Sequence, residues 1–290
     1  MPALPPTQFV EHRGVRLAYQ HWPGRPGAPA LICLPHLTGH KGSFADLSAA
    51  LSPAYAVYAL DLRGRGESDR PAEGYGFAYH AGDLLACAEA WGLETFGLIG
   101  HSFGATAASY LASIRPRRVR ALVLLDGGAD PQDDTLRAMY PTISRLDQTY
   151  ASLEAYLAAM RATPFFQPWD SALERYFTAD VVALPEGGVR PRASAAAVAR
   201  DLDAHFTYSL CLHFPAVRCP TLFARPALGL RGDRGHVFSE TEAAAIARQI
   251  ADCARVEVPT CNHYTLLLGG GPPCLPAVRA FLAARLPAVS

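Results

Sequence analysis

Short apolar runs alternate along this chain with longer stretches of helical periodicity, and this alternation restricts its possible folds. The runs are Ala30–Leu34, Ala54–Leu60, Phe96–Ile99, Val119–Leu125, Thr221–Ala224 and Val256–Val258. They lack polar alternation, as expected for strands buried on both faces of a parallel sheet. Helical patterns lie between them, at Ser43–Leu51, Tyr79–Trp91, Phe103–Ile114, Glu240–Ala251 and Ala277–Ala284. The sequence therefore predicts an α/β fold with a doubly wound, mostly parallel sheet, which a hairpin over Thr7–Trp22 precedes.

One interval, residues 129–215, interrupts this rhythm. It contains no convincing strand, and it carries many aromatic residues together with helical patterns at Thr135–Ser144, Leu153–Arg161, Ser171–Phe177 and Ala193–Tyr208. An insertion of this length between strands is too long for a loop. We therefore expect a core made of residues 1–128 and 216–290 and a helical cap made of residues 129–215. Most of the aromatic residues should form the core of the cap, and a few should line a pocket.

Charge and hydropathy limit the partners that the chain can have. Its 290 residues include 26 basic and 26 acidic side chains, so no net field attracts nucleic acid or an anionic membrane. No apolar run approaches the roughly 18 residues that span a bilayer, and the first residues lack the pattern of a signal peptide. We expect a cytoplasmic protein that acts on a small molecule. Nothing in the composition indicates an oligomeric state.

Cysteine spacing and glycine spacing argue against a bound cofactor. The seven cysteines are odd in number and form no C-x-x-C pair, which predicts reduced, buried thiols. No cluster of cysteine and histidine residues has the spacing of a zinc site. The glycines at 64 and 66 lack the spacing of a dinucleotide fingerprint. We therefore expect neither a metal nor a cofactor.

The stretch GHSFG, residues 100–104, places a serine where a strand turns into a helix. A strand followed by G-x-S-x-G and a helix is the pattern of a nucleophile elbow. The serine then adopts a strained backbone conformation, and glycine is needed where a side chain would collide with neighbouring backbone. The amide of Phe103, at the helix N-terminus, could bind a developing oxyanion. The pattern predicts that Ser102 is a nucleophile.

Several further stretches accompany this elbow, and together they resemble the α/β-hydrolase family over nearly the whole chain. They are LPHLTGHKGSF at 34–44, DLRGRGESDRP at 61–71, VRALVLLDGG at 119–128 and NHYTLLLG at 262–269. The resemblance implies a nucleophile–acid–histidine triad in this chain order, with a helical cap over the site. His263 then follows the last predicted strand as the base that activates Ser102. His101 and His36 are expected to pack and to order a loop, and His205, His213 and His236 are weaker candidates for the base.

The acid of the triad has two candidates. Family members usually carry it about nine residues after the proline that opens the penultimate strand, a position that Gly229 occupies here. Asp233 lies four residues later. Asp126 ends the strand after the elbow, a position that some branches of the family use, and we favour it over Asp233. A carboxylate is needed because the imidazolium that forms during reaction must be stabilised.

The loop over 34–44 corresponds to the oxyanion loop of the family. The usual glycine after the histidine is replaced by Leu37, whose backbone N–H remains available, so Leu37 and Phe103 are the expected oxyanion donors. The larger side chain of Leu37 should narrow the pocket. We also expect Asp61 and Arg63 to form a buried pair that holds the loop near the elbow.

The resemblance favours a hydrolase that cleaves a carboxylic ester, lactone or thioester through an acyl-enzyme. Serine at the elbow argues against relatives that need a carboxylate nucleophile, namely epoxide hydrolases and haloalkane dehalogenases. Three alternatives remain open: carbon–carbon bond hydrolysis of a vinylogous diketone, cofactor-free oxygenation, and ligand binding on a hydrolase scaffold without turnover. Substrate identity does not follow from fold.

Overall fold

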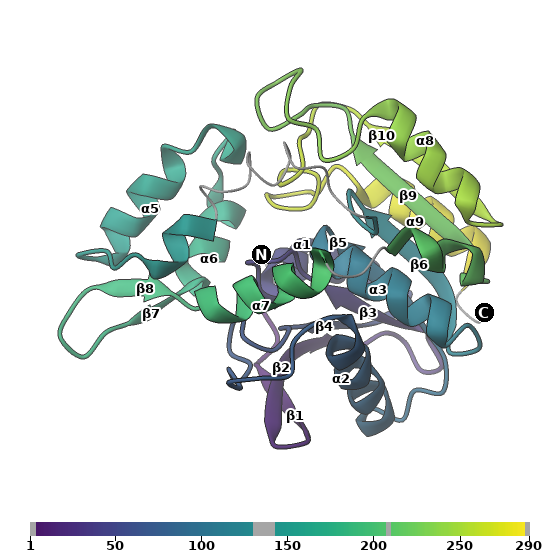
Figure 1. Ribbon diagram of the computed structural model, residues 1–290, viewed down its shortest axis with the longest axis horizontal. Coiled ribbons are helices and arrows are strands. Elements are labelled where there is room, and N and C mark those ends of the chain that lie inside the picture. The colour runs from purple at the N-terminus through teal and green to yellow at the C-terminus, as the bar shows by residue number, and fades with distance from the viewer. Residues whose placement is uncertain (1–3, 130–142, 207–209, 288–290) are drawn as a thin grey trace.

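The computed structural model describes residues 4–129, 143–206 and 210–287, and it confirms the predicted α/β class. Eight strands form one sheet in the order β1-β2-β4-β3-β5-β6-β9-β10 (Figure 1). Their bounds are β1 (Gln8–His12), β2 (Val15–Trp22), β3 (Ala30–Leu34), β4 (Ala56–Leu60), β5 (Phe96–His101), β6 (Val119–Leu125), β9 (Thr221–Pro226) and β10 (Cys253–Val258). The hairpin β1–β2 and the β2–β4 pairing are antiparallel, and the remaining pairs are parallel.

Helices cover both faces of this sheet. They are α1 (Ala45–Leu51), α2 (Phe77–Ala90), α3 (Phe103–Ile114), α8 (Glu240–Gln249) and α9 (Leu275–Arg285). Along β3, Ile32 and Leu34 pack into a cluster with apolar residues of α2, α3 and α8. Leu31 and Cys33 point to the opposite cluster, which α1 and α9 complete. Because successive side chains of a strand point to opposite faces, a strand covered on both sides must be apolar at every position.

The segment 143–216 contains the helices α5 (Leu153–Arg161), α6 (Ser171–Ala179) and α7 (Ala195–Phe206), which were expected from their periodicity. It also contains the 3₁₀ turns η2 (Arg145–Asp147), η3 (Pro164–Phe166) and η4 (Leu210–Ala216). The helical pattern at Thr135–Ser144 lies almost entirely outside the described residues. In Figure 1, α5 and α6 form a lobe beside the sheet, and α7 leads back toward α3.

The expectation that this interval contains no strand was wrong. Two three-residue strands, β7 (Val181–Ala183) and β8 (Val189–Pro191), pair as an antiparallel ribbon. Gly187 and Gly188 both have positive φ and reverse the chain between them. Each strand is too short to produce a recognisable alternation, so the Pro-Glu-Gly-Gly turn was the only local signal.

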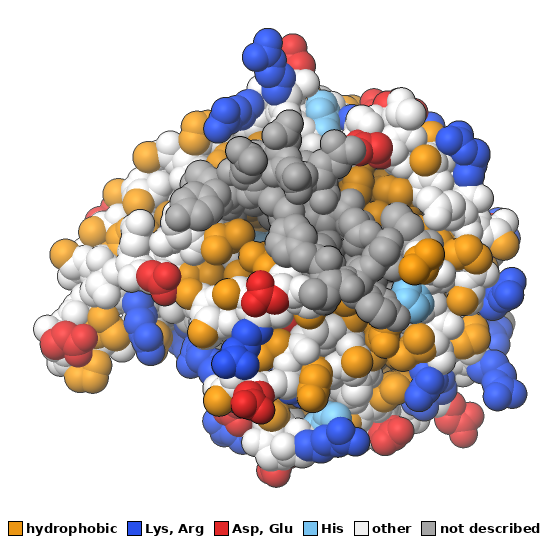
Figure 2. All heavy atoms as spheres, in the orientation of Figure 1, with side chains coloured by type: hydrophobic (Ala, Val, Ile, Leu, Met, Phe, Trp, Pro, Cys, Tyr) orange, Lys and Arg blue, Asp and Glu red, His pale blue; other side chains and the backbone are white. Residues whose placement is uncertain are grey.

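The lobe has its own apolar cluster, and that cluster reaches the chain near the end of β10. It joins aromatic residues of α5 and α6 to Tyr264 and Leu268. In Figure 2, hydrophobic side chains border the centre of the face shown, and charged side chains are more frequent toward its edge. None of the helices in the described ranges combines the length and the apolar character needed to cross a bilayer.

The cysteines whose side chains are described are all free thiols, and all but Cys253 are buried. Burial raises the pKa of Cys219 to about 11 and that of Cys261 to about 12. These thiols are therefore protonated near neutral pH and act as small apolar side chains. Within the described ranges no group of three or more histidine, cysteine or acidic residues is placed to hold a metal ion.

Candidate active site

Ser102 stands between the end of β5 and the start of α3, in a backbone conformation that is rare for a residue with a side chain. Its φ is 54° and its ψ is −121°. A Cβ atom at Gly100 would lie 2.4 Å from the backbone nitrogen of Ala105, and one at Gly104 would lie 2.2 Å from the carbonyl oxygen of Leu34. Both contacts are with backbone, which cannot move aside. The two glycines therefore allow the sharp strand-to-helix turn that presents Ser102.

The end of β6 packs directly against this turn. The Ser102 amide donates to the carbonyl of Leu125 at 2.9 Å. A Cβ atom at Gly127 would lie only 2.3 Å from the carbonyl oxygen of Ser102. Asp126 lies between Leu125 and Gly127 and also has a positive φ, of 45°. The strained serine and the strained aspartate thus occupy adjacent strand ends, as expected for the carboxyl edge of a parallel sheet.

His263 contacts Asp126 and His101, the residue that precedes Ser102. Its Nδ1 is 2.7 Å from Oδ2 of Asp126, and both side chains are buried. The Nε2 atom of His101, which precedes Ser102, lies 2.8 Å from the carbonyl oxygen of His263 and must donate to it. Because a carboxylate only accepts, Nδ1 of His263 carries a proton, and in the neutral imidazole Nε2 then carries the lone pair. Within the described part of the chain, Nε2 of His263 is buried without a hydrogen-bond partner.

Asp233, the other candidate acid, lies elsewhere. It is exposed, at the tip of a narrow reversal in which isolated bridges pair Gly229 with Gly232 and Arg231 with Arg234. The carboxylate that meets the imidazole of His263 is that of Asp126. This geometry favours Asp126 over Asp233 as the acid of the predicted triad.

The predicted oxyanion loop is held by Tyr176 of α6 through contacts with two of its histidines. Its hydroxyl oxygen lies 3.1 Å from Nε2 of His36. Its ring stacks on His40 with centroids 4.4 Å apart, and its carbonyl lies 3.1 Å from Nε2 of that histidine. Burial, reinforced by the charges of His101, His263, Arg145 and His40, holds the pKa of His36 well below its usual range. His36 is therefore neutral and orders the loop, as its place in the sequence suggested.

The two residues expected to bind an oxyanion belong to the segment that follows β3 and to the elbow itself. Leu37 is buried between β3 and the 3₁₀ turn η1 (Lys41–Phe44). Phe103 is the first residue of α3, so its amide has no acceptor within the helix. The carbonyl oxygens of Leu34 and Pro35, which precede Leu37 by two to three residues, lie against Gly104 of the elbow.

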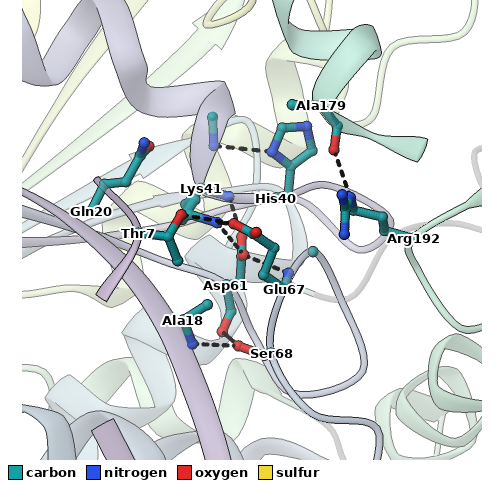
Figure 3. A network of polar contacts seen from close by, with 12 residues as sticks. Thr7, Ala18, Gln20, His40, Lys41, Asp61, Glu67, Ser68, Ala179 and Arg192 are labelled. Carbon is teal, nitrogen blue, oxygen red and sulfur yellow. Dashed lines mark hydrogen bonds and ion pairs between the residues drawn. The ribbon is translucent and has the colours of Figure 1, made fainter. Parts of the chain in front are cut away.

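The predicted pair between Asp61 and Arg63 does not form. Asp61 accepts hydrogen bonds from the backbone amide and from Nζ of Lys41, the latter at 2.8 Å, and from the amide of Glu67 (Figure 3). Arg63 instead binds Asp83 of α2 through two bonds of 2.6 and 2.7 Å. The chain turns sharply between the two residues, so their side chains face different elements. Lys41 therefore anchors the predicted oxyanion loop to Asp61, a contact that local spacing did not reveal.

Sequence reasoning also missed Arg65, the arginine between the two glycines of this turn. Its side chain is fully buried. Its Nε donates to the carbonyl of Leu37 at 2.9 Å, and its guanidinium carbon lies 5.7 Å from the ring centre of Phe103. An arginine enclosed in a Gly-Arg-Gly turn was the available signal, but its partners are distant in the sequence.

Sequence comparison places the chain in a family that fits this geometry. The sequence model of the family described as alpha/beta hydrolase fold matches residues 29–270, and the chain belongs to that family. The 2-(acetamidomethylene)succinate hydrolase of Mesorhizobium japonicum is 28% identical over 253 residues, which are 81% of this chain and 82% of that protein. The N-formylmaleamate deformylase of Pseudomonas putida is 34% identical over 134 residues, 46% of this chain and 48% of that protein. The family and these relatives support a hydrolase.

Comparison with solved structures gives the same fold. The crystal structure of E-2-(acetamidomethylene)succinate hydrolase superposes with a TM-score of 0.83 over 95% of this chain and 98% of that one, at 24% sequence identity. At this level of identity the likeness concerns the fold, and the chemistry must be argued from the residues of this chain.

Proposed function

We propose that this chain is a serine hydrolase that uses Ser102, His263 and Asp126 as its catalytic triad. The observation that carries the proposal is the buried Asp126–His263 pair, set beside a strained serine at the end of β5. The Asp126 carboxylate fixes the imidazole in the tautomer whose Nε2 can accept a proton. A serine hydroxyl alone is a weak nucleophile, and a base held in this way activates it.

The mechanism follows from these roles. Ser102 attacks the substrate carbonyl while His263 takes its proton, and the amides of Leu37 and Phe103 bind the oxyanion. Each such donor contributes about 3 kcal/mol to transition-state stabilisation. His263 then returns the proton to the leaving group, which departs and leaves an acyl-serine. Water activated by His263 attacks this ester, and the acid is released with Ser102 restored.

A carboxylic ester, lactone or thioester is the substrate class that this machinery serves most directly, because its leaving group departs readily. A second candidate is a carbon–nitrogen bond of an amide or carbamate. It is favoured by the relatives, since N-formylmaleamate deformylase and putative carbamate hydrolases of Klebsiella share local identity with this chain. The two candidates share the acylation step and differ in how much the leaving group depends on the proton of His263.

We propose that residues 129–215 act as a cap over this site. The apolar cluster of the lobe that contains α5 and α6 includes Tyr264, the residue after His263. Tyr176 of α6 contacts both His36 and His40 of the predicted oxyanion loop. Aromatic residues on that side suit an apolar or aromatic portion of a small substrate.

Matched substrates test the proposal. Hydrolysis of p-nitrophenyl acetate and of p-nitroacetanilide, which share one acyl group, would be measured for the wild type, Ser102→Ala and His263→Ala. Turnover of the ester that both substitutions abolish supports the triad, and turnover of the anilide as well extends it to amides. Oxygen consumption that persists in Ser102→Ala, with no hydrolysis by the wild type, would contradict it in favour of an oxygenase.

A further inference from the structure

Arg65 is a fully buried arginine outside the proposed triad, and its contacts join two parts of the molecule. Nε donates to the carbonyl of Leu37 at 2.9 Å, and Nη1 donates to the carbonyl of Arg63 at 2.9 Å. Nη1 also forms an ion pair of 2.5 Å with Oδ2 of Asp201, on α7. A buried guanidinium is costly unless it is paired, so these contacts determine where the group can lie.

On one side, Arg65 touches both residues proposed to bind the oxyanion. It holds the carbonyl of Leu37, and its guanidinium lies near the ring of Phe103. A planar guanidinium fixes the direction of a carbonyl that it binds. The Leu37 carbonyl shares its peptide plane with the Thr38 amide, so holding it restrains the backbone of Leu37 and thereby the directions that the Leu37 N–H can take. Oxyanion donors act only when they are oriented before the reaction, because reorganisation would consume the stabilisation that they supply.

On the other side, Asp201 fixes Arg65. The Asp201 carboxylate accepts from the amide of Gly76 at 2.6 Å and lies 3.1 Å from Nε2 of His80. Although burial alone raises the pKa of Asp201, the charges of His80 and Arg65 outweigh it and hold that pKa well below its usual value. Asp201 is therefore a carboxylate at neutral pH. Because it belongs to α7, the position of that helix determines where the guanidinium of Arg65 is held.

We infer that Arg65 is a positioning residue of the oxyanion hole, and that Asp201 couples the placement of α7 to the orientation of the Leu37 amide. The inference rests on the proposed function, which assigns that amide to the oxyanion. It assigns Arg65 no contact with the substrate. If the inference is correct, the Arg65–Asp201 ion pair links the position of α7 to the ability of the oxyanion hole to stabilise the transition state.

The first test does not depend on activity. Hydrogen–deuterium exchange of the peptide that covers residues 34–44 would be compared in the wild type, Arg65→Met, Asp201→Asn and Arg63→Lys. Arg63 is the matched control, because it is a buried arginine of the same turn that pairs with Asp83 instead. We expect exchange of this peptide to rise about tenfold or more in Arg65→Met and Asp201→Asn, as local opening becomes easier, and to stay unchanged in Arg63→Lys.

The second test separates orientation of the hole from substrate binding. It compares kcat and KM for p-nitrophenyl acetate with the inhibition constant of 1,1,1-trifluoro-4-phenylbutan-2-one, whose adduct with serine carries an oxyanion. We expect Arg65→Met and Asp201→Asn to lower kcat and raise the inhibition constant together, by about 10- to 100-fold, with KM within about threefold. The double variant should be no worse than Arg65→Met, because both substitutions act through one contact.

The outcomes are distinguishable. The coupling is overturned if hydrogen exchange of residues 34–44 is unchanged in folded Asp201→Asn. This near-isosteric variant decides the matter if Arg65→Met does not fold. An equal fall of kcat in Arg63→Lys shows general loosening and also overturns it. If the wild type hydrolyses neither probe substrate and Ser102 takes no acyl group, the proposed function fails. Faster exchange in the two variants would then still support the link between α7 and the loop.

Discussion

Asp126 and His263, 137 residues apart in the sequence, meet with 2.7 Å between Oδ2 and Nδ1. The two residues follow β6 and β10, which lie on either side of β9 in the sheet. Both side chains are buried, so the interaction is shielded from solvent and from salt. This pair determines which nitrogen of His263 faces away from the carboxylate, and the proposed chemistry depends on it.

Asp126→Asn is therefore expected to lower kcat for p-nitrophenyl acetate by about 10³- to 10⁴-fold, because an amide can hold the imidazole in the wrong tautomer and cannot stabilise its charged form. Asp233→Asn, at an exposed turn, should change kcat by no more than about threefold. Steady-state kinetics of the two purified variants compare these effects. The opposite ranking would move the acid to Asp233.

Gly127 is expected to tolerate no side chain. A Cβ atom there would meet the carbonyl oxygen and Cα of Ser102, at 2.3 and 2.6 Å. We expect Gly127→Ala to lower the free energy of unfolding by about 3 kcal/mol or more, since the backbone of the elbow must shift. Gly92→Ala is the control, with a positive φ but open space around it, and it should cost about 1–2 kcal/mol. Urea unfolding of both variants measures the difference, and equal losses would contradict the proposed contact.

The buried histidines His36 and His101 predict that the free energy of unfolding falls at acidic pH. Burial, together with the charges of neighbouring histidines, holds the pKa of both His36 and His101 well below the usual value. Such groups bind protons more readily in the unfolded chain, so their contribution is present above a pH of about 6.5 and is lost as pH falls below it. Each of the two histidines should lower the free energy of unfolding by about 1 kcal/mol between about pH 7 and pH 5.5. Urea midpoints of the wild type and His101→Gln at both pH values test this, and an unchanged pH dependence in the variant would count against it.

Removing the charge of Lys41 should destabilise the protein more than removing the charge of an exposed basic residue. It is buried, and its Nζ lies 2.8 Å from Asp61 and 2.6 Å from Glu67. Lys41→Met leaves Asp61 as an uncompensated buried carboxylate, which should cost about 3–5 kcal/mol. Arg285→Met, which removes an exposed ion pair with Asp252, should cost less than about 1 kcal/mol. Similar losses in the two variants, measured by urea unfolding, would show that Asp61 is not stabilised by Lys41.

The elements nearest the proposed active site were the easiest to predict. The strands Ala30–Leu34 and Val119–Leu125 and the helix Phe103–Ile114 have the bounds that the sequence indicated. Buried parallel strands are continuously apolar, and the glycines of the elbow mark where one of them ends. Local pattern is sufficient there because each element is defined by its own residues.

The partners of charged side chains could not be predicted in the same way. Asp61 and Arg63 are two positions apart, yet they bind Lys41 and Asp83 respectively. Arg65 depends on Asp201, which lies in another part of the chain. The choice between Asp126 and Asp233 likewise needed the positions of both strand ends relative to His263. Such contacts are made by the fold as a whole, and no periodicity encodes them.

Labelling with a fluorophosphonate, followed by peptide mass spectrometry, tests the central claim most directly. The reagent phosphonylates a serine only when a base activates it and an oxyanion hole receives the developing charge. We predict a single adduct on the peptide that carries Ser102, lost in Ser102→Ala and slowed by about 10³-fold or more in His263→Ala. Folded wild-type protein that forms no adduct on Ser102, or that labels equally fast in His263→Ala, would contradict the proposed triad.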